Sequence, residues 1–120
     1  MAKTILVVDD SPSHLKLMQS ALEGHGYRIF TAEDGEQALL QVANNRPDVI
    51  LLDIVLPKKN GYQVCRQLKM APETQAIKII MVSSKTHDTD RYWGMKQGAD
   101  GYINKPFDPK DLLAAVENRV

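Results

Sequence analysis

The sequence predicts an α/β fold, a doubly wound parallel sheet in which five strands alternate with five helices. The main observation is a set of nearly unbroken apolar runs, Ile5–Val8, Val49–Leu52 and Lys78–Val82. Runs without polar alternation are typical of strands that are covered on both faces of a parallel sheet. Segments with apolar residues at helical spacing separate the runs, as right-handed crossovers between parallel neighbours require.

Shorter signals complete the order of elements. Arg28–Ala32 and Gly101–Asn104 are the two remaining strand candidates. The dipeptide Ser11–Pro12 pairs a capping residue with a proline at the first helical position, and Gly26 lies just past the expected end of that helix. The other helices are expected from Asp34–Gly35, from about Gly61, over Asp88–Gln97 and from Asp108–Pro109.

Composition places the chain among single-domain soluble proteins. With 15 basic and 15 acidic residues the formal net charge is zero, which argues against a nucleic-acid partner. The lone Cys65 cannot form an internal disulfide, which fits a reducing, cytoplasmic compartment. No apolar run approaches the roughly 20 residues that span a bilayer, so we expect no membrane partner. We expect residues 1–120 to form one domain with no output domain attached.

Polar residues that follow the predicted strands identify a candidate site. Asp9, Asp10, Asp53, Ser83 and Lys105 come directly after the strand candidates. Ligands of open α/β sheets bind at the carboxyl ends of strands, so we expect these five side chains at one edge. An aspartate after a strand can also be a turn former or a helix cap. That simpler interpretation suits single residues better than it suits the whole set.

The chemistry of this set favours a divalent cation and a phosphoryl group. Three carboxylates brought together repel one another, which should raise the pKa of at least one. A hard cation such as Mg²⁺, or Mn²⁺ in its place, removes the repulsion, and with Lys105 it leaves a neutral site. An aspartate can accept a phosphoryl group as an acyl phosphate. Lys105 and the cation would neutralise charge on the phosphoryl oxygens.

The residues match a known family across essentially the full chain. The chain resembles a response-regulator receiver domain of the CheY type, whose fold has the strand order 2-1-3-4-5. The matching motifs are the acidic pair Asp9–Asp10, the segment Asp53-Ile54-Val55-Leu56-Pro57 followed by Gly61, Ser83, and the segment Gly101-Tyr102-Ile103-Asn104-Lys105-Pro106-Phe107.

The resemblance implies a role for each matching residue. Asp53 would accept a phosphoryl group from a histidine kinase or phosphotransfer domain in a Mg²⁺-dependent reaction. Asp10, Asp53 and the backbone carbonyl of Val55 would bind the ion directly, and Asp9 would act largely through water. The remaining implied roles are contacts of Ser83 and Lys105 with the phosphoryl oxygens, a switch formed by Ser83 and Tyr102, and a cis peptide bond between Lys105 and Pro106.

The resemblance also implies how the signal leaves the protein. The chain would catalyse only its own phosphorylation and dephosphorylation and would not be an enzyme acting on other substrates. A protein target would bind the face formed by Asp88–Gln97, Gly101–Asn104 and the last helix. The protein itself would be a monomer or a phosphorylation-dependent dimer. Residues 92–99 are similar to stand-alone regulators of twitching motility of the PilH and PilG type, which points to motility or chemotaxis signalling. Val55 and Lys85 occupy positions that tune phosphoryl lifetime in the family.

Other interpretations of the same residues are weaker. A dinucleotide-binding oxidoreductase or a flavodoxin needs a glycine- or hydroxyl-rich loop where Asp9 and Asp10 stand. The strongest rival is an aspartyl-phosphate phosphatase or phosphotransferase acting on a small substrate. The haloacid-dehalogenase type of that class has a second aspartate where Val55 stands. Several other residues have simple structural interpretations: helix caps for Asp34 and Asp108, a packed Cys65, a solvated loop at Lys58–Lys59 and a solvent-facing His14. The spacing of His14, His25 and His87 is not that of metal ligands.

Overall fold

The computed structural model describes the backbone of residues 2–84 and 88–120, and in the second range the side chains from Tyr92 onward. Lys85 and His87, discussed above, lie outside the described residues. The five strands form one parallel sheet in the order β2-β1-β3-β4-β5, which confirms the predicted fold. The elements are β1 (Thr4–Val8), α1 (Pro12–Leu22), β2 (Arg28–Ala32), α2 (Gly35–Asn45), β3 (Val49–Leu52), α3 (Gly61–Met70), β4 (Lys78–Ser83), α4 (Asp88–Lys96), β5 (Gly101–Asn104) and α5 (Pro109–Glu117).

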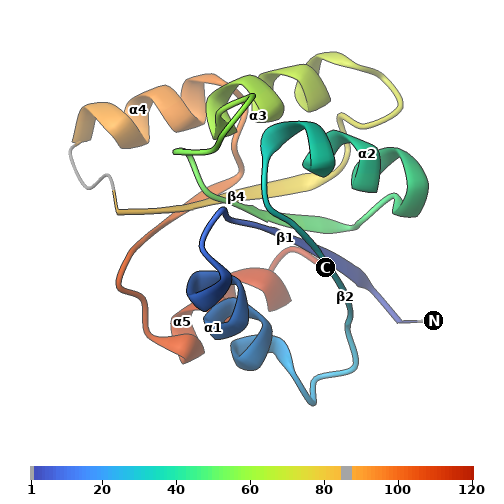
Figure 1. The fold of residues 1–120 in the computed structure, drawn as a ribbon, viewed down its shortest axis with the longest axis vertical. Helices are drawn as coiled ribbons and strands as arrows, with labels where there is room; N and C mark the ends of the chain where they lie inside the picture. The colour runs from blue at the N-terminus through green and yellow to red at the C-terminus, as the bar shows by residue number, and fades with distance from the viewer. Residues whose placement is uncertain (1, 85–87) are drawn as a thin grey trace.

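Helices cover both faces of the sheet. Figure 1 shows α2, α3 and α4 on one side and α1 with α5 on the other. Alternate residues of β1 supply the two cores: Leu6 packs with residues of α2 and α3, whereas Ile5 packs with residues of α1 and α5. Both side chains are buried, which explains why the strand lacks polar alternation. None of the described helices is both long and apolar enough to span a bilayer.

Side-chain caps determine where the helices begin. The side chains of Ser11, Asp34 and Asp108 accept hydrogen bonds from the first turns of α1, α2 and α5. The prediction that Asp34 and Asp108 are helix caps is therefore confirmed. At α3 the Asn60 side chain accepts from the Gln63 N–H and the Gln63 side chain accepts from the Asn60 N–H. Such a reciprocal capping box satisfies two backbone donors that the helix itself cannot.

The first residue of α3 lies directly against the end of β3. The Gly61 N–H donates to the Ile54 carbonyl over 2.8 Å. A Cβ atom at Gly61 would lie 2.2 Å from the Asp53 carbonyl oxygen, so only glycine permits this approach. The first residue of α3 therefore packs against the backbone of Asp53 and Ile54.

We predict that Gly61→Ala lowers the free energy of unfolding by about 1–3 kcal/mol, because the new methyl group overlaps backbone that cannot easily move. Gly94→Ala is the matched control, since its Cβ would meet only ordinary contacts at 3.5 Å or more. In a helix interior alanine is favoured over glycine, so this control should gain up to about 1 kcal/mol. Urea unfolding of the two variants measures both, and equal effects of the same sign would contradict the prediction.

Candidate functional site

Register of the parallel strands brings the predicted residues to one edge. Val8 of β1 pairs with Leu52 of β3, so Asp9 and Asp53 leave the sheet side by side. The Asp53 N–H donates to the Val8 carbonyl over 3.0 Å. On the far side of β4, the Lys105 N–H donates to the Ser83 carbonyl over 2.8 Å. The ends of β1 and β3 are thus joined by a hydrogen bond, as are the ends of β4 and β5, at the points where polar side chains follow.

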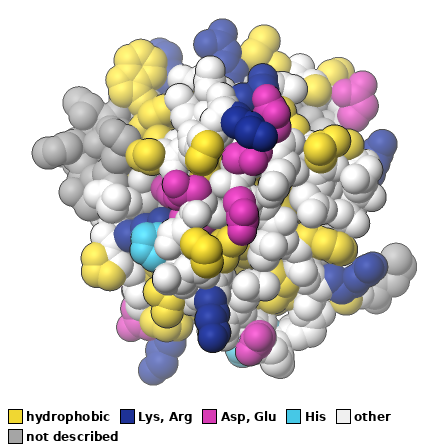
Figure 2. All heavy atoms as spheres, in the orientation of Figure 1, with side chains coloured by type: hydrophobic (Ala, Val, Ile, Leu, Met, Phe, Trp, Pro, Cys, Tyr) yellow, Lys and Arg dark blue, Asp and Glu magenta, His cyan; other side chains and the backbone are white. Residues whose placement is uncertain are grey.

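Three carboxylates gather at this edge. Asp9, Asp10 and Asp53 offer oxygens that all lie within 4.8 Å of one another. Asp9 is fully buried and Asp53 is 7% exposed, whereas Asp10 is open to solvent. Figure 2 shows acidic side chains gathered on this face with basic and histidine side chains beside them. A set of carboxylate oxygens fits a hard cation such as Mg²⁺, Mn²⁺ or Ca²⁺ better than a soft transition metal.

Lys105 provides the positive charge of the site. Its Nζ lies 2.5 Å from Asp9 Oδ2 and 3.6 Å from Asp53 Oδ2. The other oxygen of Asp9 accepts the Ser11 N–H over 3.0 Å. Both oxygens of the buried Asp9 carboxylate therefore have partners, as a buried charge requires.

Burial changes the acidity of Asp53. Loss of solvent raises the pKa of its carboxyl, the nearby Lys105 ammonium opposes that rise, and the Asp9 carboxylate adds to it. The net pKa is above the ordinary value for aspartate. Repulsion among carboxylates predicted a rise of this kind, but burial is the larger cause. One oxygen, Oδ1, accepts the Ile54 N–H over 2.8 Å, so Oδ2 is the atom that faces Lys105.

The structure also places the other predicted residues. Ser83 is fully buried at the end of β4, and Val55 is 58% exposed in the loop after β3. The ring of Tyr102 is partly buried on the side of the sheet that α4 covers. A Cβ added to Gly94 of α4 would lie 3.5 Å from that ring, which places the helix against it. The peptide bond between Lys105 and Pro106 is cis.

His14 is exposed, as the sequence predicted, but its side chain also contacts the site. Its side chain is 46% exposed, yet its Nδ1 lies 3.0 Å from Lys105 Nζ and 3.5 Å from Asp9 Oδ2. His14 and Lys105 are 91 positions apart, so the spacing of nearby residues in the sequence cannot predict their contact. The sequence signal that could have indicated this contact is the position of His14, one helical turn after the acidic pair on a capped helix.

Comparison with known proteins gives one consistent result. The family model described as response regulator receiver domain matches residues 5–117. Protein PilH of Pseudomonas aeruginosa is 43% identical over 112 residues, an alignment that covers 93% of each chain. The transcriptional regulatory protein PhoP of Bacillus subtilis is also 43% identical, over 98% of this chain and 48% of its own length.

Solved structures agree in fold over the whole chain. The chemotaxis response regulator CheY4 of Vibrio cholerae superposes with a TM-score of 0.92 at 30% identity, with 100% of both chains covered. A receiver domain of DrrB activated with BeF3 gives a TM-score of 0.90 at 33% identity, over 98% of this chain and 97% of that one.

We predict that Asp53→Asn stabilises the metal-free protein at neutral pH. A carboxyl whose pKa is raised on folding contributes stability below its unfolded pKa, and that contribution is lost as pH rises through its folded pKa. At neutral pH the ionised Asp53 therefore destabilises the fold, and the asparagine variant does not carry this penalty. Urea unfolding in EDTA across pH 3 to 7 should show an advantage for the variant that disappears toward acid pH. An advantage that stays constant or grows on acidification would contradict this.

Proposed function

The chain belongs to the response regulator receiver domain family, and we therefore propose that the carboxylate of Asp53 accepts a phosphoryl group from a donor protein. The observation that carries the proposal is that Asp53, two further aspartates and Lys105 meet at one edge of the sheet. The phosphodonor is a phosphohistidine on a histidine kinase or phosphotransfer protein. We propose that residues 1–120 act as one receiver unit, and the lone buried Cys65 supports a cytoplasmic location.

The transfer is a displacement at phosphorus. A carboxylate oxygen of Asp53 forms the new P–O bond, the P–N bond of the phosphohistidine breaks, and the imidazole leaves with its electron pair and takes a proton. Oδ2 is the better nucleophile, because Oδ1 already accepts the Ile54 N–H.

Lys105 and Ser83 contact the transferred group in this proposal. The Lys105 ammonium, 3.6 Å from Asp53 Oδ2, neutralises charge that develops on the phosphoryl oxygens. Ser83, buried at the next strand end, supplies a hydroxyl that can follow those oxygens.

Asp10, Asp53 and the Val55 carbonyl would hold Mg²⁺, with Asp9 acting through water. When bound, the ion offsets the repulsion among the carboxylates and the phosphoryl group.

The rival reading as a phosphatase or phosphotransferase for small substrates is not favoured. The family match covers residues 5–117, and both compared structures superpose over nearly the whole chain. We therefore propose that the chain catalyses only its own phosphorylation and dephosphorylation. Similarity to PilH and to the chemotaxis regulator CheY4 supports a place in motility or chemotaxis-type signalling.

We further propose that the signal leaves through α4, β5 and α5. The side chains of Tyr92, Trp93 and Met95 on α4 are 58%, 52% and 50% exposed, an unusual concentration of large apolar groups on one short helix. The same helix lies against Tyr102, whose ring is only partly buried. A movement of Tyr102 that follows Ser83 would reach this exposed surface directly, where a protein target or a second copy could bind.

Incubation with acetyl phosphate and Mg²⁺ should add one phosphoryl group to the wild-type protein, observed as a mass increase on the intact chain. Asp53→Asn should abolish the increase, because the nucleophilic oxygen is lost, and EDTA should suppress it in the wild type. Asp48→Asn is a control, since Asp48 accepts the Thr4 N–H at the opposite end of β3. Undiminished labelling of Asp53→Asn would refute the assignment.

Beryllofluoride with Mg²⁺ should change the fluorescence of Trp93, the sole tryptophan, without any transfer chemistry. The expected cause is movement of α4 relative to Tyr102. Amide NMR shifts for Tyr102 and for residues 92–97 should change in parallel, and Asp53→Asn should show neither change. Shifts confined to the surroundings of Asp53 would show that this face is not the output surface.

A further inference from the structure

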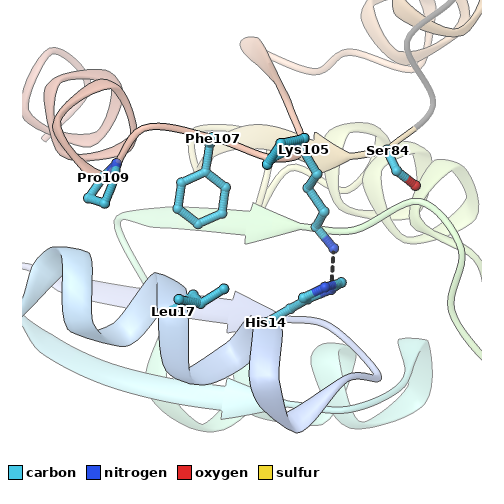
Figure 3. A pocket seen from close by; sticks show the side chains of 7 residues that line it. His14, Leu17, Ser84, Lys105, Phe107 and Pro109 are labelled. Atoms are coloured by element: carbon cyan, nitrogen blue, oxygen red, sulfur yellow. Dashed lines mark hydrogen bonds between the residues drawn. The ribbon is translucent and has the colours of Figure 1, made fainter.

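His14 and Lys105 approach each other across the edge of the sheet. His14 lies in the first turn of α1, where its backbone N–H donates to the Ser11 hydroxyl over 3.4 Å. Lys105 follows β5, and Figure 3 shows the two side chains pointing toward one another from these separate elements. Their nitrogens, Nδ1 and Nζ, lie 3.0 Å apart.

The donor and acceptor roles in this contact follow from the chemistry of the two groups. A lysine ammonium has three donors and no acceptor. A hydrogen bond at 3.0 Å therefore requires that His14 Nδ1 carries the lone pair and that the ring proton sits on Nε2. The alternative, an Nδ1–H donating to Asp9, has a longer distance of 3.5 Å and would point a proton at the nearby ammonium. The imidazole is thus an acceptor for Lys105.

Two of the three ammonium protons have an acceptor within hydrogen-bond distance. One is donated to Asp9 Oδ2 and one to His14 Nδ1, at 2.5 and 3.0 Å. Asp53 Oδ2 lies 3.6 Å from the same Nζ, just beyond hydrogen-bond distance, and is the acceptor to which the third proton can turn. We propose that His14 is a positioning residue, which fixes the rotation of the Lys105 ammonium so that one N–H faces the phosphoryl group on Asp53.

The surroundings of His14 reinforce this role. His14 and Lys105 sit at one end of a pocket of about 350 Å³ whose other walls are mainly apolar. Figure 3 shows Leu17, Phe107 and Pro109 lining it beside the two polar side chains. The Lys105 side chain is only 10% exposed, whereas the His14 side chain is 46% exposed, so the contact joins a largely buried ammonium to a half-exposed imidazole. A hydrogen bond in such a setting is worth more than one in open solvent.

This inference rests on the proposed function of Asp53, and it predicts a rate effect that runs through Lys105. Without His14, the ammonium keeps Asp9 as a partner but rotates more freely about that bond. Its contact with the developing phosphoryl charge then loses orientation, and the transfer slows.

The test compares substitutions that separate the acceptor from the size of the side chain. His14→Leu replaces the imidazole with an apolar side chain of similar size, which still fills the space beside the pocket but removes the acceptor. His14→Asn restores an acceptor, because Asn Oδ1 is as many bonds from Cα as His Nδ1. His25→Leu is the matched control, a histidine exposed in the turn after α1. The rate constant for phosphorylation by acetyl phosphate is measured for each variant at fixed Mg²⁺.

His14→Leu should lower that rate constant about tenfold, the scale of one hydrogen bond to a charged group. His14→Asn should stay within about twofold of the wild type, and His25→Leu should not differ from it. A purely structural role would slow His14→Leu and His14→Asn alike. If the wild type is labelled on Asp53 and His14→Leu reacts at the same rate, the role of His14 is refuted while the proposed function stands.

A second measurement needs no transfer chemistry. In metal-free protein, nitrogen-15 NMR of the imidazole should show an unprotonated Nδ1 for His14 at neutral pH. The Lys105 ammonium signal should exchange with water slowly in the wild type and in His14→Asn, and faster in His14→Leu. A protonated Nδ1, or ammonium exchange that is indifferent to His14→Leu, would overturn the inference even if Asp53 were never phosphorylated.

Discussion

The buried pair of Asp9 and Lys105 is the interaction on which the site depends. Asp9 is fully buried, and an isolated carboxylate there would cost far more free energy than the fold can offset. Its two oxygens are satisfied by the Ser11 N–H and by Lys105 Nζ. The first contact ties β1 to the start of α1, and the second ties β1 to the segment after β5. One buried charge thereby holds both ends of the site in register.

The strand order explains why a lysine is needed for this contact. β3 lies next to β1, so Asp53 comes close to Asp9 through backbone pairing alone. β5 is separated from β1 by β3 and β4, and only a long side chain can return across that distance to Asp9. Lys105 is such a side chain, and its reach brings the charge to 3.6 Å from Asp53.

Sequence reasoning predicted the fold and most of the site because both follow from periodicity and from strand ends. The caps at Asp34 and Asp108, the buried Cys65 and the meeting of the three aspartates are all local or topological consequences. The main cause of the raised Asp53 pKa is burial, which the sequence did not reveal because burial depends on how the whole chain packs around that side chain. The contact of His14 with Lys105 joins two elements through side-chain geometry, which no spacing rule describes.

The unequal burial of the acidic pair gives its two members different chemistry. Both oxygens of Asp9 already accept hydrogen bonds, so direct binding of a cation would require one of them to be broken. Asp10 is open to solvent, so its carboxylate can exchange water for a cation at little cost. This difference supports the proposed division in which Asp10 binds the ion directly and Asp9 acts through water. It also leaves Asp9 able to hold the Lys105 ammonium 3.6 Å from Asp53 Oδ2.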